Sequence, residues 1–417
     1  MKKRFNFTKS VEYCFVIAVI LTQGTMYGVM DSLYKRNISA YTFRIVCLLM
    51  ALILIGVLSK GKINISINQV IKMILAVCFF SLYILMTHNN VGSFLESLVV
   101  PFFVFFIISV IKGSEKIFKE YLSLYSNVVY ILAIISLFFY FFGTVLNIIP
   151  GITMQYANNG EWNSGINYYF LSFVNNWQTQ TIFGMTFIRN VGIFMEAPGY
   201  AFPLSISLYW ELFNQIKIRK FRCLCLIATM ITTFSTEALI MVAILGFMFI
   251  VTKKGNLFIE RIKIIVCPLI IVGIVCFIYY VIITKMTGHN SDSYSIRLND
   301  IYGALQTWLD YPCFGAGFYN TKAIYEHYII SKNFGNPTAG LLNVLAYGGL
   351  YSFFVYVFLF FKLLKYSFHV ERKKSIQIFL GLVIFFLILE PYQYDFVILL
   401  ILATIYSAPF KKIYANK

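Results

Sequence analysis

The sequence predicts an all-α polytopic membrane protein, and three observations lead to that fold class. The 417 residues are 59% hydrophobic and only 12% charged, whereas a soluble domain carries roughly 25% charged residues. Long apolar runs recur along the whole chain, each close to the roughly 20 residues that cross a hydrocarbon core. These runs are continuous rather than alternating, which argues against a β-barrel.

The apolar runs define about twelve expected transmembrane helices. They cover residues 11–30, 41–59, 70–87, 94–111, 121–142, 198–213, 222–234, 236–252, 264–284, 341–361, 376–390 and 393–410. The first run is long enough to span and no small-residue cleavage site follows it, so we expect a membrane helix there rather than a cleavable signal peptide.

The basic residues indicate the orientation. The chain carries 34 Lys and Arg and a formal net charge of +17. If the N-terminal Met1-Lys2-Lys3-Arg4 is cytoplasmic, most of these residues fall into cytoplasmic connections, which is the positive-inside pattern. We therefore expect both termini in the cytoplasm. The basic surplus then faces anionic lipid rather than nucleic acid. The eight Cys show neither a disulfide framework nor a metal-binding spacing.

Residues 1–417 are expected to form one membrane domain with two large extracytoplasmic loops. The first loop, 143–197, is rich in Asn, Gln, Thr and aromatic residues, as a carbohydrate-facing surface would be; an ordinary solvated loop is the alternative. The second loop covers 285–340. Long loops in a compact membrane domain often carry function.

The second loop is expected to contain an amphipathic helix over about 294–310, lying on the outer membrane surface or packed over the bundle. Its apolar residues recur at helical spacing: Leu298, Ile301, Leu305 and Trp308. The Gly-rich stretch "CFGAGFYN" follows Pro312. Arg297 and Asp300 lie one turn apart on the helix flank, where a surface ion pair is the alternative to a site.

The stretch "RNVGIFMEAPGYAFPLS", residues 189–205, is an irregular entrance to a membrane helix. Pro198 favours a helix start, and a helix from there to Phe213 covers only about 24 Å of a core near 30 Å. The backbone before it is then non-helical at membrane depth, which is tolerated only inside protein or beside a watery cavity. A carboxylate at that depth, Glu196, is by default a site candidate. Alternatively, Glu196 and Arg189 cap and pair at the helix start.

The side chains on the outer side suit one chemistry. No nucleotide, phosphate-loop or metal motif is present, so an enzyme would need an activated substrate that is already in the membrane. A lipid-linked sugar diphosphate fits, because Arg side chains bind phosphates bidentately and a His or carboxylate can act as general base. Arg189, Arg297, Glu196 and His327 supply these types, although His327 could be an ordinary exposed side chain.

Three motifs together resemble the O-antigen and capsular polysaccharide polymerases of the Wzy type, relatives of the O-antigen ligases. They are "RNVGIFMEAPGYAFPLS", "SIRLNDIYGALQTWLDYPCFGAGF" and "GLLNVLAYGGLYSFF". The resemblance covers most of the chain. It implies an inner-membrane glycosyltransferase that joins oligosaccharide repeat units carried on undecaprenyl diphosphate, without metal or cofactor. A chain-length regulator and a flippase of the same pathway are possible partners, along with membrane lipids.

The resemblance also implies site residues. Arg189 and Arg297 map onto the family's functional arginines, and with Glu196 and His327 they form the expected catalytic set, with Arg189 and Glu196 facing Arg297. The expected glycan contacts are Asp300, Trp308, Tyr200, Asn336 and Glu390. Ligases show a His-Asn pair at the end of the last large outer loop, just before the next span. This chain has Asn336-Pro337 there, which favours a polymerase. In "MEAPG" an Ala separates the Glu from the Pro of the family pattern.

Two rival functions follow from the same features. An O-antigen ligase would transfer finished glycan to another acceptor. A lipid-linked glycan flippase or transporter would move the substrate without changing it, but the chain lacks the internal repeat that many transporters show.

Overall fold

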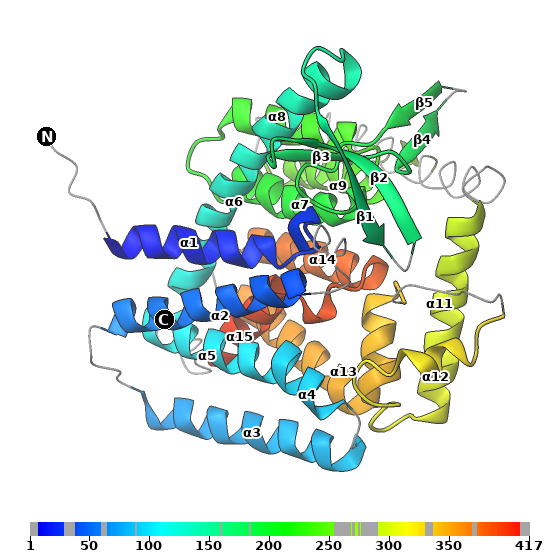
Figure 1. Ribbon diagram of the computed structural model, residues 1–417. Helices are drawn as coiled ribbons and strands as arrows, with labels where there is room; N and C mark the ends of the chain where they lie inside the picture. Colours follow the sequence, from blue (N-terminus) through cyan, green and yellow to red (C-terminus); the bar gives the residue numbers. More distant parts are fainter. Residues whose placement is uncertain are drawn as a thin grey trace, which may run out of the picture. The chain divides into compact units, whose positions relative to one another are not determined.

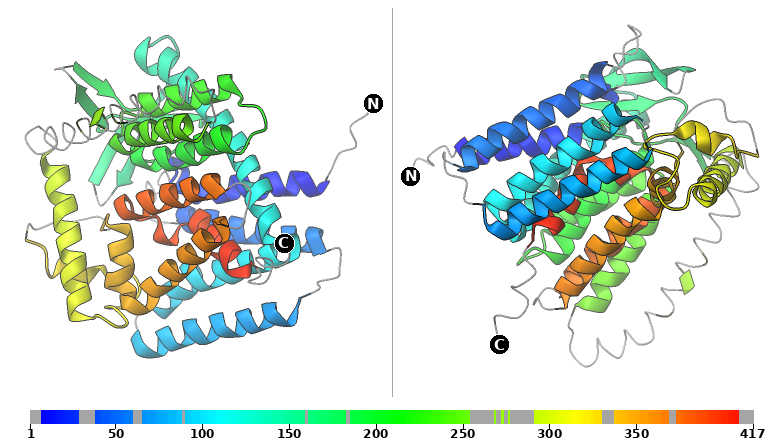
Figure 2. Two further views of the ribbon diagram at one scale, coloured as in Figure 1. Left: turned by 180° about the vertical axis from the view of Figure 1, so that it is seen from behind. Right: turned by 90° about the horizontal axis from the view of Figure 1, so that it is seen from below.

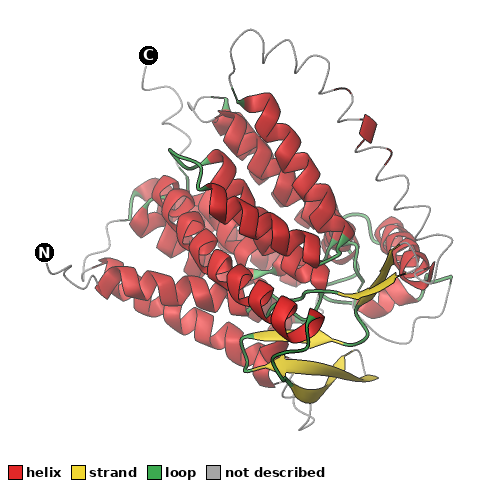
Figure 3. Cartoon of the chain, turned by 90° about the horizontal axis from the view of Figure 1, so that it is seen from above, coloured by secondary structure: helices red, strands yellow, loops and turns green. Residues whose placement is uncertain are grey.

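The structure is a computed structural model that describes residues 7–28, 38–59, 65–87, 90–158, 161–182, 185–253, 291–329, 337–368 and 373–408, with the single positions 268, 272, 273 and 276. Most of these residues are helical (Figure 3). The helices are α1 Phe7–Leu21, η1 Met26–Gly28, α2 Ile38–Ser59, α3 Ile67–Thr87, α4 Val91–Phe94, η3 Leu95–Val99, α5 Val100–Lys112, α6 Ser114–Phe139, η4 Tyr140–Val145, α7 Ala197–Phe213, α8 Lys220–Thr232, α9 Thr236–Thr252, α11 Ser291–Asp310, α12 Thr321–Tyr325, α13 Gly340–Ser367, α14 Lys373–Leu389, η5 Tyr392–Tyr394 and α15 Phe396–Ser407.

The helical membrane protein predicted from composition is confirmed. Among the described residues, five helices are long and apolar enough to cross a bilayer: Tyr41–Ser59, Ile67–Thr87, Val91–Lys112, Ser114–Val145 and Gly340–Ser367. Twelve crossings stay a prediction, since α9, α14 and α15 are shorter apolar helices. Apart from the four single positions 268, 272, 273 and 276, the span expected over 264–284 lies outside the described residues, as do both termini.

The first expected span, 11–30, is not one helix. Helix α1 ends at Leu21, and Gly24 then takes a left-handed φ of 63°. Thr25 forms an isolated β-bridge with Phe194, and Met26 N–H donates to the carbonyl of Ile193 at 2.9 Å. The backbone here leaves the helix because the stretch before α7 offers it other hydrogen-bond partners.

The chain divides into two compact units, which we describe separately. Unit 1 contains residues 1–22, 43–121 and 293–417; unit 2 contains 23–42 and 122–292. In unit 1, α5 packs against α15 and α13 packs against α14 (Figure 2). In unit 2, α7, α8 and α9 pack on one another and share their unit with all the strands (Figure 1).

Unit 2 contains β-structure that the all-α expectation missed. The strands β1 Ile152–Asn158, β2 Glu161–Tyr168 and β3 Ser172–Asn175 form an antiparallel sheet in that order, and β4 Thr179–Ile182 pairs with β5 Met185–Ile188. The sheet packs on the stretch before α7: Phe173 N–H donates to the carbonyl of Gly192 at 2.7 Å, and Tyr156, Phe173 and Val191 share a buried cluster with Met26 and Ala197.

Helix α13 in unit 1 is broken in its first half. Gly349 has φ 59° and ψ −165°, a conformation that helical residues do not adopt and that is essentially restricted to glycine. A Cβ there would also collide with the Cys313 carbonyl. Gly349 therefore interrupts the helix at a position that no other residue could occupy without strain.

Substituting Gly349 by Ala should destabilise the protein by about 3 kcal/mol or more, because both the backbone conformation and the space exclude a side chain. The melting temperature of purified protein in detergent measures the effect. Gly381→Ala in α14 is the matched control, because nothing lies within 4 Å of its Cβ position and alanine is the better helix former. Equal melting temperatures for the two variants would contradict this account.

Candidate functional site

The Gly-rich turn after α11 in unit 1 supplies hydrogen-bond partners for the backbone groups that the break in α13 leaves free. The N–H groups of Ala316 and Gly317 donate to the carbonyls of Ala346 and Tyr347 at 2.8 and 3.1 Å. In return, Leu350 and Tyr351 N–H donate to the carbonyls of Pro312 and Cys313 at 2.9 and 3.0 Å. Backbone groups at membrane depth need such partners, so this exchange fixes the end of α11 against α13.

Arg297 and Glu390, both predicted as site residues, meet in this unit. The Nη2 atom of Arg297 lies 2.8 Å from Oε1 of Glu390. The arginine side chain is 29% exposed and the carboxylate side chain only 10%. Glu390 is fixed at the end of α14, where its backbone carbonyl packs so closely on Gly340 that a Cβ on Gly340 would collide with it. A partly accessible guanidinium is thus held by a largely buried carboxylate.

Asp300 is fully buried one turn after Arg297, and it ties three segments together. Tyr328 donates its hydroxyl to Oδ1, and Thr338 donates its N–H at 2.9 Å and its hydroxyl at 2.8 Å to Oδ2. Burial, followed by the hydrogen bond to Asp300 and its charge, raises the pKa of Tyr328 above its ordinary value. These contacts position α11 against the start of α13. The glycan contact predicted for Asp300 stays a prediction.

His327 lies at the other end of α11. Its Nε2 is 2.8 Å from Oδ2 of Asp310. Asp310 follows Arg297 by thirteen residues, which at 1.5 Å per residue places the two about 20 Å apart along the helix. The structure therefore brings Arg297 to Glu390 and not to His327.

Trp308 and Asn336 are the other two glycan contacts predicted in this unit. Trp308 on α11 is half-buried, and its Nε1 is buried without a hydrogen-bond partner among the described residues. Asn336 lies outside the described residues. The described part of the chain contains no group of three or more His, Cys, Asp or Glu that could hold a metal ion.

Arg189 in unit 2 contacts the end of α8. Its Nε donates to the carbonyl of Thr233 at 3.1 Å and its Nη2 to the carbonyl of Phe234 at 3.2 Å. A cation at a helix C-terminus is favourable because the last carbonyls lack partners within the helix. Arg189 thus fixes the strand β5 and the stretch before α7 to α8, a role that sequence reasoning did not identify.

Glu196 is the residue directly before α7, and the non-helical backbone predicted there is confirmed. Its own side chain does not cap the helix. Instead, the first helical N–H, of Ala197, donates to Oε1 of Gln178 at 3.0 Å. Burial raises the pKa of nearby Tyr156. The hydrogen bond from Trp177 lowers this pKa, and the negative charge of Glu196 raises it further. The sequence analysis overlooked Gln178, whose partner lies 19 residues away.

Tyr200 is fully buried in unit 2. Its hydroxyl lies 3.0 Å from Oγ of Ser136, and its ring stacks on Phe194 with centroids 5.0 Å apart. These are contacts of a core residue. Because Arg189, Glu196 and Tyr200 belong to unit 2 and Arg297 to unit 1, the shared site expected for them stays a prediction.

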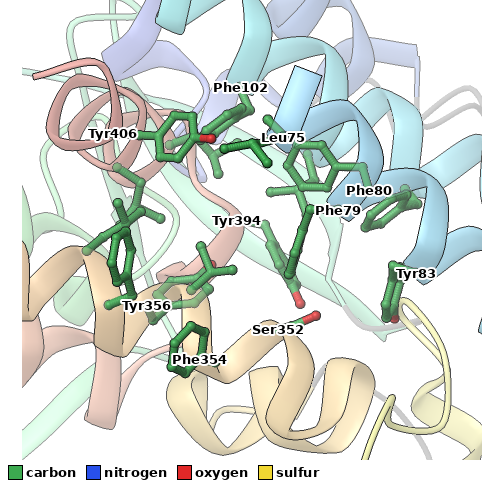
Figure 4. A pocket seen from close by; sticks show the side chains of 18 of the residues that line it. Leu75, Phe79, Phe80, Tyr83, Phe102, Ser352, Phe354, Tyr356, Tyr394 and Tyr406 are labelled. Atoms are coloured by element: carbon green, nitrogen blue, oxygen red, sulfur yellow. The ribbon is translucent and has the colours of Figure 1, made fainter. Parts of the chain in front are cut away.

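An apolar cavity of about 320 Å³ lies inside unit 1 between α3, α5, α13 and α15 (Figure 4). Figure 4 shows the rings of Phe79, Phe80, Phe102 and Tyr406 around one side and Phe354 and Tyr356 on the other. From Leu75 to Tyr83, both in its wall, α3 rises about 12 Å. The cavity therefore runs along the membrane helices.

Three of the four tyrosines that line this cavity donate their hydroxyls to backbone carbonyls. Tyr83 donates to the carbonyl of Tyr347 at 2.6 Å, Tyr356 to that of Gln393 at 2.6 Å, and Tyr406 to that of Lys72 at 2.8 Å. Only their rings remain to line the space, which makes the cavity suited to hydrocarbon. The cavity could not be predicted from the sequence, because its lining residues come from segments that are far apart along the chain.

One end of the cavity lies beside the segment that carries Glu390. Tyr394, four residues after Glu390, lines the cavity and packs on Phe318 of the Gly-rich turn, with centroids 4.8 Å apart. Tyr319 packs on Tyr394 and Tyr347 at 5.5 and 5.9 Å. Glu390 of the polar pair and Tyr394 of the cavity wall thus belong to one short segment of the chain.

Comparison with known families finds a match to part of the chain. Residues 221–357, about a third of the chain running from α8 to α13, match the family model of the O-antigen ligase. This segment is similar to that family's domain, so the predicted resemblance to the O-antigen ligase-like superfamily is confirmed over these residues. Together with the apolar helices, the match indicates a multi-pass membrane protein. No curated protein matches the chain.

Replacing Tyr328 by Phe should destabilise the protein by about 1–3 kcal/mol, because a buried carboxylate loses a donor. The melting temperature in detergent reports this loss. The control is Tyr302→Phe, since Tyr302 lies on the same helix as Asp300 and is 42% exposed. A Tyr328 variant as stable as the control would show that Asp300 does not depend on this hydroxyl.

Proposed function

We propose that this protein is a polysaccharide polymerase that joins oligosaccharide repeat units carried on undecaprenyl diphosphate at the outer face of the bacterial inner membrane. The observation that carries the proposal is the Arg297–Glu390 pair, 2.8 Å apart, beside an apolar cavity between membrane helices. A lipid-linked sugar diphosphate has the same two halves, an anionic head and a hydrocarbon chain.

In the proposed reaction, a hydroxyl of the acceptor unit attacks the anomeric carbon of the growing chain. The bond from that carbon to the lipid diphosphate breaks, and its electron pair leaves with the diphosphate. Arg297 neutralises the diphosphate charge through bidentate hydrogen bonds. The diphosphate competes with Glu390 for the guanidinium, and the carboxylate so released takes the proton of the acceptor hydroxyl. The reaction balances without a metal or cofactor.

The choice of a polymerase over a ligase is supported by the residues before α13. Asn336 is preceded by Gly335 rather than by the His of the ligase His-Asn pattern, and it is followed by Pro337. Thr338, the next residue, donates to Asp300. In a strain lacking this protein, a polymerase predicts that single repeat units still reach their final acceptor. A ligase predicts instead that long polymer accumulates on the lipid carrier. A flippase of lipid-linked glycan is disfavoured if purified protein lengthens glycan in detergent without a gradient.

The polar half of the site is tested by Arg297→Ala and Glu390→Gln. Removing a preorganised cation from the developing charge should lower the elongation rate about 100-fold or more, and Arg297→Lys should restore little because it lacks the planar fork. The ladder of chain lengths, measured with purified protein and lipid-linked repeat units, should shrink toward single units. Lys322→Ala is the control, an exposed cation on α12; an unchanged ladder in the Arg297 variants would remove this residue from the site.

The apolar half is tested by a neighbouring pair of Trp substitutions on α3. Ala76 lines the cavity, whereas Val77 is 49% exposed and points away from it. Ala76→Trp should fill the space and raise the KM for a donor with a long isoprenoid chain while leaving a short-chain donor unaffected; Val77→Trp should change neither. Equal KM values for the two variants with the long-chain donor would contradict a role of the cavity in lipid binding.

A further inference from the structure

The turn between β2 and β3 in unit 2 has an unusual sequence for its conformation. Tyr169 and Phe170 take left-handed φ values of 55° and 59°, and Leu171 N–H donates to the Tyr168 carbonyl at 3.0 Å. Two consecutive positive φ values are typical of hairpin turns made from Asn, Asp and Gly. For bulky residues they are rare and strained.

Neighbouring side chains hold this turn in place without covering it. Phe170 N–H donates to Oδ1 of Asn167 at 2.7 Å, and the Tyr27 hydroxyl donates to the Phe170 carbonyl. The turn's own side chains stay outside, since Tyr169 and Phe170 are each 55% exposed and Leu171 is 48% exposed. The fold thus maintains a strained backbone that presents two aromatic rings and a leucine outward.

The turn lies beside the end of a membrane-spanning helix. The ring of Phe139, the last residue of α6, stacks on Tyr168 at 5.5 Å and contacts Tyr169 at 6.1 Å. Helix α6 and the π-helical turn η4 together form the candidate span Ser114–Val145. The large apolar residues around Phe139 are exposed, as expected of lipid-facing positions: Phe138, Phe141, Phe142, Leu146 and Ile148.

The charge pattern permits this turn to enter the membrane interface. No Asp, Glu, Lys or Arg occurs between Glu161, the first residue of β2, and Arg189. No ionised group of the turn, of β3 or of the end of β2 beside the turn would therefore have to be desolvated. Aromatic side chains are enriched where a bilayer meets water. The exposed surface of Tyr169, Phe170 and Leu171 therefore continues the apolar surface of α6 into the sheet.

We propose that the turn Tyr169–Leu171 is a membrane-contact site that inserts its two rings and its leucine among phospholipids at this end of α6. The contact anchors the sheet, and with it the stretch before α7, at a fixed depth. The energy stored in the turn conformation is then offset by lipid contact rather than by contacts within the protein. This inference depends on the membrane span and not on the function proposed above.

The test uses the full-length chain in vesicles of phosphatidylethanolamine and phosphatidylglycerol, with the photo-crosslinking residue benzoylphenylalanine at position 170. After irradiation, mass spectrometry should detect phospholipid adducts at least tenfold more often than with the same residue at Asn176. Asn176 is an exposed position after β3, and its side chain donates to Ser164 of β2. Ser164 precedes Tyr168 by four strand residues, which places it about 13 Å from the turn. Equal or fewer adducts at position 170, or adducts to added glycan in place of lipid, would overturn the proposal.

A second variant distinguishes lipid contact from a purely structural role of the ring. Phe170→Gly relieves the left-handed φ and should raise the melting temperature in detergent. In vesicles that gain should disappear, because the wild-type ring gains lipid contact that glycine cannot make. The same gain in vesicles as in detergent would show that lipid does not stabilise this turn.

Discussion

The exchange of hydrogen bonds between the Gly-rich turn and the broken helix α13 is the constraint on which the candidate site depends. A helix interrupted inside a bilayer leaves carbonyls and N–H groups that lipid cannot satisfy. Here Ala316 and Gly317 supply donors to the freed carbonyls, and Pro312 and Cys313 supply acceptors. The turn cannot leave without exposing these groups, so α11 is held at two points: at its C-terminal end by the turn at Pro312, and near its middle by the hydrogen bonds between Asp300 and Thr338. Arg297, one turn before Asp300, therefore meets Glu390 in a fixed geometry.

The parts of this arrangement that sequence could predict are those set by local chemistry. Pro198 and the residues before it predicted a non-helical entrance, and α7 does begin at Ala197. The apolar spacing predicted membrane helices at the described positions. The pairing partners were not accessible in this way. Arg297 and Glu390 are 93 residues apart, and Asp300 and Thr338 are 38 apart; no local pattern distinguishes these partners from other carboxylates and hydroxyls, because tertiary packing selects them.

The sheet was missed for a different reason. Residues 152–188 alternate apolar and polar side chains only briefly, within strands of four to eight residues, and their amides and aromatic rings also suit a solvated loop. The strands are stabilised from outside their own sequence: Met26 and Val191 complete their apolar cluster, and Gly192 accepts a hydrogen bond from Phe173. A short strand gains its stability from such neighbours, so composition alone indicated a loop.

The candidate site consists of an apolar cavity and a polar pair, Arg297 and Glu390, and the two parts need opposite properties. A hydrocarbon chain requires a wall without hydrogen-bonding groups, and the cavity obtains one by turning the Tyr83, Tyr356 and Tyr406 hydroxyls onto backbone carbonyls. An anionic head requires a cation that is held in place yet accessible. The pair meets both conditions. The buried carboxylate of Glu390 holds Arg297 in place, and Arg297 itself stays partly exposed. An unpaired arginine would be mobile, and a fully buried pair could not exchange its partner for a phosphate. The unequal burial of the pair is therefore what the proposed binding and release of a charged lipid head requires.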